Sequence, residues 1–361
     1  MGRDSKLTAA LMAAALVVAA LMLSACGSDS SDTTGGGETG NAEATVEEGG
    51  TEEAAGGDEG GKLGLLMDVT RNDKSFGQAT YEGAKAAAEE LGLELTVVDD
   101  LASDPQKAQS ALLNMAKESD YVINGAIPLM GGLPRVAEQN PDTQFAAYAV
   151  SIPSSDNLHW AFQDWYPLGY LAGIAAAEST KSDVVGFVGG DQIPPTISGE
   201  AGFNDGVKAV DPKVKVLSTI TGSFEDSAKA QQAASAQAAQ GADVIYSFLD
   251  AGHLGAVEAA EEAGGVKLIG VISPKCDVSK GLEIGDTTAR PDEMVRELVV
   301  KMASGEIEDT EYGVQNEEIA GFGFCPGGST PAVEKAVEEA RQEFTEGALT
   351  TPSEFKASEA E

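Results

Sequence analysis

Polar side chains and one aromatic ring crowd the segment from Asp68 to Phe76, where an expected strand gives way to an expected helix. The segment includes two carboxylates, Asp68 and Asp73, and the amide of Asn72. Such groups can hold the polar edge of a small molecule, and an aromatic ring can stack on a flat one. The sequence therefore predicts a ligand-binding function for this segment.

Part of the same segment has a structural explanation. Ser75, followed three residues later by Gln78, matches a capping box that closes the first turn of a helix. The box does not account for Phe76. This ring either packs on the neighbouring strand or presents its face to a ligand, and composition leaves both interpretations open.

Residues suited to catalysis are scarce. The only histidines, His159 and His253, do not supply a histidine-based triad or a multi-histidine metal site. Asp99 and Asp100 point to opposite faces of an extended chain, which suits paired acid–base work poorly. The sequence contains no Walker loop, and its glycine pairs lack dinucleotide-binding spacing. We expect a protein that is not an enzyme and uses no cofactor and no metal.

Short apolar runs alternate with alanine-rich segments of helical period from Lys62 onward, which predicts βαβ units and an α/β fold. About eight strands are too many for one compact sheet, and turn-forming segments interrupt the pattern at 151–157 and 273–286. We therefore expect two doubly wound, Rossmann-like lobes. The expected strands are 62–67, 94–98, 121–124, 144–150, 184–188, 214–219, 243–248 and 267–272, and the expected helices are 76–91, 105–117, 166–178, 199–210, 227–240, 253–263 and 331–344.

Ligands of open parallel sheets bind beyond the carboxyl ends of the strands. The segments that follow the expected strands combine glycines, carboxylates and single aromatic rings, which suits a small, polar and planar ligand. Trp165, beside Gln163 and Asp164 near the expected crossing between lobes, either belongs to the core or walls the pocket. The segments are 68–76, 125–128, 189–195, 222–225, which contains Phe224, and 250–255, which contains Asp250 and Gly252.

The N-terminus has the layout of a secretory signal, with charged residues, an apolar run from Leu7 to Leu23 and a small-residue cleavage site. The run could alternatively be a transmembrane helix, at the lower limit of length. Leu23-Ser24-Ala25-Cys26 resembles the bacterial lipobox, so we expect residues 1–25 to be a signal peptide and Cys26 to carry lipid. The composition of residues 26–61 predicts a disordered acidic tether.

The formal net charge of −36 argues against nucleic acid as a partner, because phosphate binding needs clustered Lys and Arg. Cys276 and Cys325 are the other two cysteines. Disulfides persist outside the cytoplasm, so we expect one bridge between them, and two buried free thiols are the alternative.

The segment Asn72–Gly92 resembles the aspartate-lysine-serine-phenylalanine signature of the basic membrane protein family, lipoproteins that serve ABC importers as substrate-binding components, some of them purine nucleoside receptors. Further similarity runs in order to about Arg290, through 164–190, 193–216, 222–230 and 240–271. The resemblance implies a type I periplasmic binding protein fold with a hinge. It also implies that Phe76 and Phe224 are aromatic walls, that Asp68 binds a base and that Gly252 lies beside a sugar.

Two departures from the family concern ribose. Ile272 stands where relatives usually carry an Asp, and the segment 288–291 stands where they carry a Lys. In the family, those residues hold ribose hydroxyls. We therefore expect ligand binding by this chain to depend less on ribose than it does in relatives.

The sequence thus predicts a lipid-anchored protein on the extracytoplasmic face of the cell membrane that closes around a small heteroaromatic ligand and delivers it to an ABC permease. A sensor that presents its closed form to a membrane receptor kinase is the alternative. The expected division is an N-terminal lobe of 62–162 and 274–322, a C-terminal lobe of 163–273 and 323–347, and an acidic tail of 348–361. The expected ligand-binding residues are Asp68, Asn72, Asp73, Phe76, Gln163, Asp164, Trp165, Phe224, Asp250 and Gly252.

Overall fold

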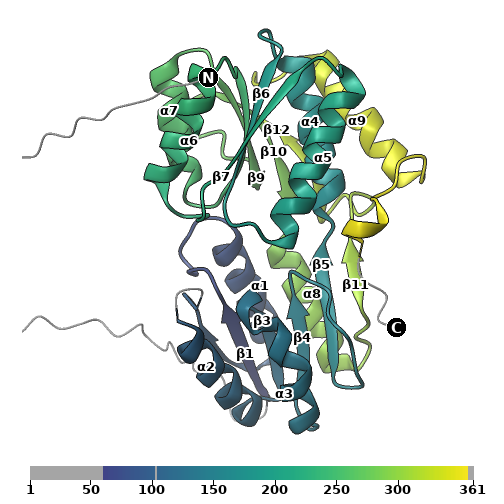
Figure 1. The fold of residues 1–361 in the computed structure, drawn as a ribbon. Coiled ribbons are helices and arrows are strands. Elements are labelled where there is room, and N and C mark those ends of the chain that lie inside the picture. Colours follow the sequence, from purple (N-terminus) through teal and green to yellow (C-terminus); the bar gives the residue numbers. More distant parts are fainter. Residues whose placement is uncertain (1–59, 102–103, 357–361) are drawn as a thin grey trace, which may run out of the picture. The chain divides into compact units, whose positions relative to one another are not determined.

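The computed structural model describes residues 60–101 and 104–356, and within them the chain forms two six-stranded sheets flanked by helices (Figure 1). The expected signal peptide, Cys26 and nearly all of the expected tether lie outside the described residues. We call the two sheets with their helices the first lobe and the second lobe.

The sheet of the first lobe is parallel throughout, in the order β11-β5-β4-β3-β1-β2. In β1, five consecutive residues after Lys62 are buried, as expected for a parallel strand covered on both faces. The strands are β1 (Lys62–Met67), β2 (Glu94–Val98), β3 (Tyr121–Gly125), β4 (Gln144–Tyr148), β5 (Leu158–Gln163) and β11 (Thr310–Tyr312).

The sheet of the second lobe has the order β12-β10-β9-β8-β6-β7 and is parallel except for the antiparallel pair β10 and β12. The strands are β6 (Val184–Gly189), β7 (Lys215–Ile220), β8 (Val244–Phe248), β9 (Lys267–Ile272), β10 (Glu283–Ala289) and β12 (Ala320–Phe324).

Helices cover both faces of each sheet (Figure 1). In the first lobe, α1 (Phe76–Leu91) and α8 (Pro291–Ser304) pack together, while α2 (Pro105–Glu118), η1 (Ile127–Gly132) and α3 (Leu133–Gln139) share a separate core. In the second lobe, α4 (Trp165–Ser179), α5 (Pro194–Val210) and α9 (Pro331–Thr345) lie opposite α6 (Ser227–Ala239) and α7 (His253–Ala263).

The contact between α4 and α5 depends on glycines. A Cβ atom on Gly169 would lie 2.0 Å from Gly199 O, and one on Gly202 would lie 2.0 Å from Tyr166 O. Any side chain at these positions would force the helices apart. Because both helices begin at the edge of the second sheet where its parallel strands end, this close contact also fixes the segments that precede them.

The sheets divide the chain differently from the expected boundaries. The expected N-terminal lobe includes 274–322, yet β10 lies within this segment and pairs in parallel with β9 of the second sheet. Only α8 and β11 of this segment belong to the first lobe. The chain therefore passes between lobes after β5, after β10 and between β11 and β12.

The described part of the expected acidic tail is packed against the second lobe. The Thr351 hydroxyl donates a 2.5 Å hydrogen bond to Asp164 Oδ2, and the Phe355 ring stacks on Tyr166 with centroids 5.8 Å apart. Residues 348–356 thus contact the first turn of α4, a role that their composition did not reveal.

Candidate functional site

A cavity lies where the carboxyl ends of strands from both sheets meet. Each of the five segments that the sequence singled out contributes at least one residue to its wall. The expectation that these segments converge is therefore met by the geometry. The lining residues are Asp68, Val69, Phe76, Gly125, Ile127, Ala149, Trp165, Asp191, Ile193, Pro195, Phe224, Phe248, Leu249, Asp250, Val271 and Ile272.

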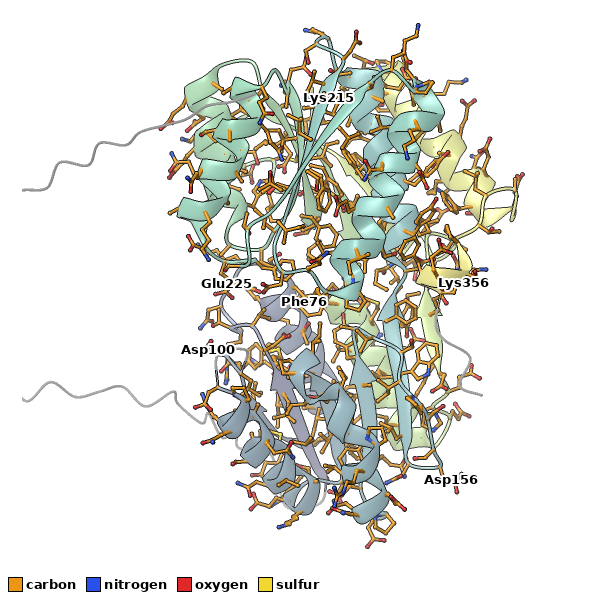
Figure 2. The ribbon with its side chains drawn as sticks, in the orientation of Figure 1. Phe76, Asp100, Asp156, Lys215, Glu225 and Lys356 are labelled. Carbon is orange, nitrogen blue, oxygen red and sulfur yellow. A yellow bond between two sulfur atoms is a disulfide. The ribbon has the colours of Figure 1, made fainter. Side chains whose placement is uncertain are left out.

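Phe76 both packs on a strand and lines the cavity, so the two interpretations of this ring hold together. Its ring is stacked on Tyr148 at the end of β4, with centroids 5.6 Å apart and planes 4° apart. Tyr148 is 1% exposed, so it gives Phe76 a rigid support on one face. Figure 2 shows Phe76 at the junction of the two lobes.

Phe224, in the second lobe, is the other expected aromatic wall. Its ring lies against the backbone of Gly190, where an added Cβ would be 2.3 Å from Phe224 Cδ1. Trp165 is buried, forms an edge-to-face pair with Phe248 at 5.0 Å and lines the same cavity. Aromatic rings therefore reach the cavity from both lobes.

Asp68 is half-buried directly after β1 and accepts a 3.3 Å hydrogen bond from the backbone amide of Ile127. Burial raises its pKa above the usual value, the Ile127 amide opposes that rise, and the negative charge of Asp191 adds to it. Asp191, which was not among the expected site residues, follows β6 of the second lobe. Its position in the segment 189–195 was the signal that could have identified it.

Asp250 lies in the second lobe after β8 and is 8% exposed. Burial, together with the negative charge of Asp73, raises the pKa of Asp250 to about 6. Its Oδ1 atom accepts a 3.4 Å hydrogen bond from the backbone amide of Phe76. The carboxylate therefore lies at the N-terminus of α1, whose partial positive charge offsets part of the cost of burying the negative charge.

Asn72 and Asp73 do not line this cavity. Asp73 is 5% exposed and caps α1, accepting hydrogen bonds from the amides of Ser75, Gly77 and Gln78 at 2.7 to 2.9 Å. The predicted capping box is therefore wrong, because Ser75 makes no side-chain cap hydrogen bond. The two carboxylate oxygens of Asp73 together accept from three backbone amides, whereas the single hydroxyl of Ser75 could not serve all three.

Gln163 and Asp164 belong to a crossing between lobes rather than to the cavity wall. Gln163 Nε2 and the Asp164 amide each donate a 2.8 Å hydrogen bond to Tyr312 O, which ties two of the crossing segments together. Burial raises the pKa of Asp164 to about 7, against the opposing hydrogen bond from Thr351. These residues therefore hold crossing segments together rather than line the cavity.

Gly252 also has a structural role. Its amide donates a 2.9 Å hydrogen bond to Phe224 O, and an added Cβ would lie 2.7 Å from that oxygen. Gly252 therefore holds the segment that carries Phe224 and is not among the cavity-lining residues described above.

Ile272 has a left-handed backbone conformation, with φ of 75°, where it ends β9 at the cavity wall. This region is unfavourable for a β-branched side chain, and Asn or Asp occupies it more readily. Ala149, which also lines the cavity, has φ of 89°. Backbone strain of this kind concentrates at functional sites, so both positions support the assignment of the cavity.

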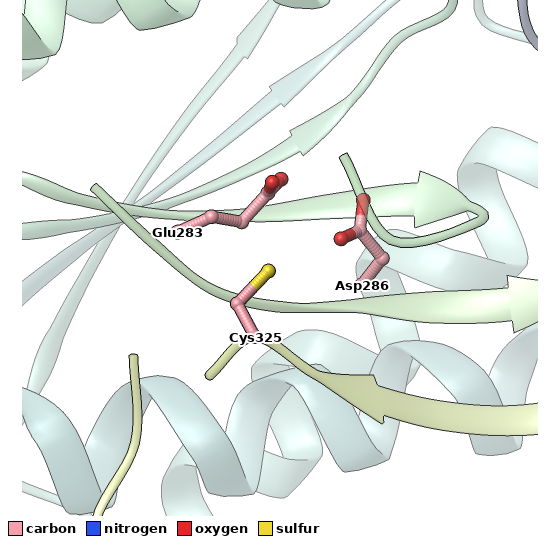
Figure 3. A group of neighbouring side chains, drawn as sticks. All are labelled: Glu283, Asp286 and Cys325. Atoms are coloured by element: carbon pink, nitrogen blue, oxygen red, sulfur yellow. The ribbon is translucent and has the colours of Figure 1, made fainter. Parts of the chain in front are cut away.

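Cys276 and Cys325, which the sequence pairs, are joined by a disulfide with a Cα–Cα distance of 5.4 Å. Figure 3 shows Cys325 pointing toward Glu283 and Asp286, and the potential ligand atoms of the three residues lie within 4.8 Å of one another. The sulfur is bonded to Cys276, however, so it is not a thiolate ligand. Lys275 Nζ, 3.8 Å from Asp286 Oδ1, already supplies positive charge to this cluster.

His253 lies beside the same acidic pair, is 1% exposed and places Nε2 3.4 Å from Glu283 Oε1. Burial and the charge of Lys275 lower the pKa of His253 to about 3, so the ring is neutral. Burial also raises the pKa of Asp286, and the neighbouring Glu283 adds to the rise. We interpret the cluster as a buried structural network.

Over the described ranges 60–101 and 104–356, no helix is both long and apolar enough to span a membrane.

Comparison with known proteins places these features in context. The family described as ABC transporter substrate-binding protein PnrA-like (Bmp) matches residues 61–343. The ABC transporter nucleoside-binding protein BmpA of Lactococcus lactis subsp. cremoris (strain MG1363) is 26% identical over 312 residues, which cover 81% of this chain and 89% of the relative. A protein named as a lipoprotein from Pyrococcus abyssi (strain GE5 / Orsay) is 28% identical over 210 residues, covering 56% of this chain and 52% of the relative.

Solved structures show the same fold. An ABC transporter solute-binding protein from Aeropyrum pernix K1 superposes with a TM-score of 0.69 at 23% identity, covering 81% of this chain and 94% of the other. The expected α/β fold with two lobes, typical of periplasmic solute-binding proteins, is confirmed.

Proposed function

Because this chain belongs to the Bmp family of PnrA-like ABC transporter substrate-binding proteins, we propose that it binds a small, flat heteroaromatic molecule and delivers it to an ABC permease. The observation that carries this proposal is the cavity itself, which has Phe76 on one lobe, Phe224 on the other and the Asp68 carboxylate beside them. Rings from two lobes suit a flat ligand, because each ring can cover one of its faces.

The contacts of the two rings support a sandwich. Tyr148 already covers one face of Phe76, and the Gly190 backbone holds Phe224. Both rings are therefore supported before a ligand arrives, which lowers the entropic cost of binding. Asp68 then accepts hydrogen bonds from ring nitrogens or exocyclic amines of the ligand.

The ligand makes few contacts through ribose in this proposal. Ile272 offers a hydrocarbon surface at the cavity wall where the family resemblance leads one to expect a carboxylate. A hydroxyl buried against this side chain would lose its hydrogen bonds to water without replacement. A free base or another heteroaromatic compound therefore fits better than a nucleoside, although the L. lactis relative is named for nucleoside binding.

Transport in this proposal depends on closure of the two lobes. A ligand that touches both lobes stabilises the closed form by its differential affinity for it, and the permease recognises that form. The bound molecule is released unchanged, without catalysis. Lipid on Cys26 holds the protein on the extracytoplasmic face of the cell membrane, a placement consistent with the lipoprotein name of the P. abyssi relative.

Mass spectrometry of the ligand retained by the purified protein is the first test of this function. The protein is then unfolded, dialysed to remove that ligand and refolded, and the refolded protein is titrated calorimetrically with candidate ligands. We expect a purine, pyrimidine or related heteroaromatic compound in the extract and tighter binding of such rings than of sugars. Retention of a sugar, with no binding of any heteroaromatic compound, would contradict the proposal.

A further inference from the structure

The ionisable side chains that line the cavity all carry the same sign of charge. Asp68, Asp191 and Asp250 are carboxylates, and among the lining residues within the described ranges none is Lys, Arg or His. A cleft lined by one sign of charge with apolar walls attracts counter-charge strongly. The cavity therefore favours a positively charged ligand.

Three cations of the neighbouring segments, Arg71, Lys74 and Lys275, are not among the residues that line the cavity. Arg71 donates from Nε to Asp99 Oδ2 at 2.8 Å and lies 5.4 Å from the ring centroid of Tyr81. Lys275 donates from Nζ to Val271 O and lies 3.8 Å from Asp286 Oδ1.

The two carboxylates that matter most come from different lobes. Asp68 follows β1 and Asp191 follows β6, and burial, with a smaller contribution from the charge of Asp191, raises the pKa of Asp68. Asp250 differs from them, because its Oδ1 is already directed to the N-terminus of α1. Asp191 is exposed and Asp68 is half-buried, so both carboxylates can keep their charge, and a cation placed near the two would be attracted by each of them.

The aromatic rings of the cavity act in the same direction. The face of an aromatic ring carries negative charge density and attracts a cation placed over it. Phe76, Trp165, Phe224 and Phe248 all line the cavity. Carboxylates and aromatic faces together form an environment that suits a charged ring better than a neutral one.

We propose that the physiological ligand is a cationic heteroaromatic compound, bound with its positive charge between Asp68 and Asp191 and its ring between Phe76 and Phe224. This inference rests on the proposed function and narrows its substrate class. The proposal excludes nucleotides and other anions as ligands, because their negative charges would face three carboxylates.

Matched pairs of rings that differ in charge test the inference. Nicotinamide is compared with the cation 1-methylnicotinamide, and adenosine with 1-methyladenosine, which is positively charged at neutral pH, by calorimetric titration of the full-length protein. We expect the charged member to bind about tenfold more tightly or better, because the carboxylates and the aromatic faces attract its positive charge. Its affinity should also fall as salt is added.

Two variants identify the carboxylates responsible. Asp68→Asn and Asp191→Asn should each reduce the preference for the cation about tenfold or more, whereas Asp156→Asn, an exposed residue far from the cavity in Figure 2, should leave it unchanged. Equal or tighter binding of the neutral rings by the wild-type protein would overturn the inference while leaving the proposed function intact. If no ring of either charge binds, both fail. Should a variant not fold, the comparison of ring pairs on the wild type still decides.

Discussion

The backbone amide of Phe76 donates a 3.4 Å hydrogen bond to Asp250 Oδ1, which joins the first turn of α1 in the first lobe to the segment after β8 in the second. The contact lies at the cavity wall, where both residues would touch a bound ligand. It therefore links the ionisation of one buried carboxylate to the contact between lobes.

The ionisation of Asp250 should make stability depend on pH. Burial, and then the charge of Asp73, raise the pKa of Asp250 from 3.8 to about 6, so the folded protein binds this proton more tightly than the unfolded chain does. Stability is therefore gained as pH falls from above 6 toward 4 and is lost as pH rises through about 6. Thermal unfolding should show a higher midpoint at pH 5 than at pH 7.5.

Asp250→Asn tests this assignment, because Asn keeps an oxygen for the Phe76 amide but loses the charge. We expect the variant to exceed the wild type in stability at pH 7.5 by about 1 to 3 kcal/mol and to show a smaller change between pH 5 and 7.5. Asp156→Asn, an exposed residue, is the matched control. An unaltered pH slope in the Asp250 variant would show that the raised pKa belongs elsewhere.

Ile272→Asp should increase the contribution of ribose to binding. A carboxylate at this cavity position can accept hydrogen bonds from sugar hydroxyls, each worth about 1.5 to 3 kcal/mol when one partner is charged. The ratio of adenosine to adenine affinity should therefore rise about tenfold or more in calorimetric titrations. Ile272→Leu, which stays apolar, should not change that ratio, and an equal effect of both variants would rule out the proposed reason.

Removal of the disulfide should destabilise the folded protein. The bond joins residues 49 positions apart and encloses a segment that visits the first lobe through α8 and β11 before returning at β12. A double Cys276→Ser and Cys325→Ser variant should lose about 2 to 5 kcal/mol in the free energy of unfolding. A reductant should lower the unfolding midpoint of the wild type but not of the variant, and two alkylatable thiols in unreduced protein would contradict the bond.

Cys26→Ser should release the protein from membranes. Cys26 lies outside the described residues, and the prediction rests on the lipobox-like segment that ends at this residue. Cell fractionation with detection by antibody should find wild type in the membrane fraction and the variant outside it. Ser24→Thr, which leaves Cys26 in place, serves as a control, and identical fractionation of wild type and the Cys26 variant would exclude a lipid anchor there.

The regular βαβ part of the fold could be predicted from sequence because period and composition agree there. The expected bounds of β1, β2, β9, α1 and α7 match the structure, since each apolar run or stripe ends at a polar or glycine boundary. β10 was not predicted, because its residues Glu283 and Asp286 fall at the end of the segment 273–286, which the sequence pattern indicates as turn-forming. Both carboxylates are in fact 0% exposed, with Ser279, Lys275 and His253 as neighbours that local sequence does not reveal.

Positions in the candidate site were predictable where a residue lies within two positions of a strand end, as Asp68 does after β1 and Asp250 after β8. Residue type alone did not separate Asp73, which caps α1, from Asp191, which lines the cavity. That distinction depends on which amides the carboxylate can reach after folding. The same applies to Gln163, whose partner Tyr312 is 149 positions away in the sequence.

Calorimetric titration of a ring ligand against Phe76→Ala and Phe224→Ala tests the central claim most directly. The ligands titrated are purines, pyrimidines, related heteroaromatic compounds and sugars. Phe322→Ala is the control, because Phe322 lies in β12 and does not line the cavity. We predict that each cavity variant weakens binding. The lost ring contact should cost about 0.5 to 1.5 kcal/mol, in addition to the hydrophobic contribution of the surface that the ring no longer buries. The Phe322 variant should bind like the wild type. Tight binding of a non-aromatic solute, unchanged in both cavity variants, would contradict the account.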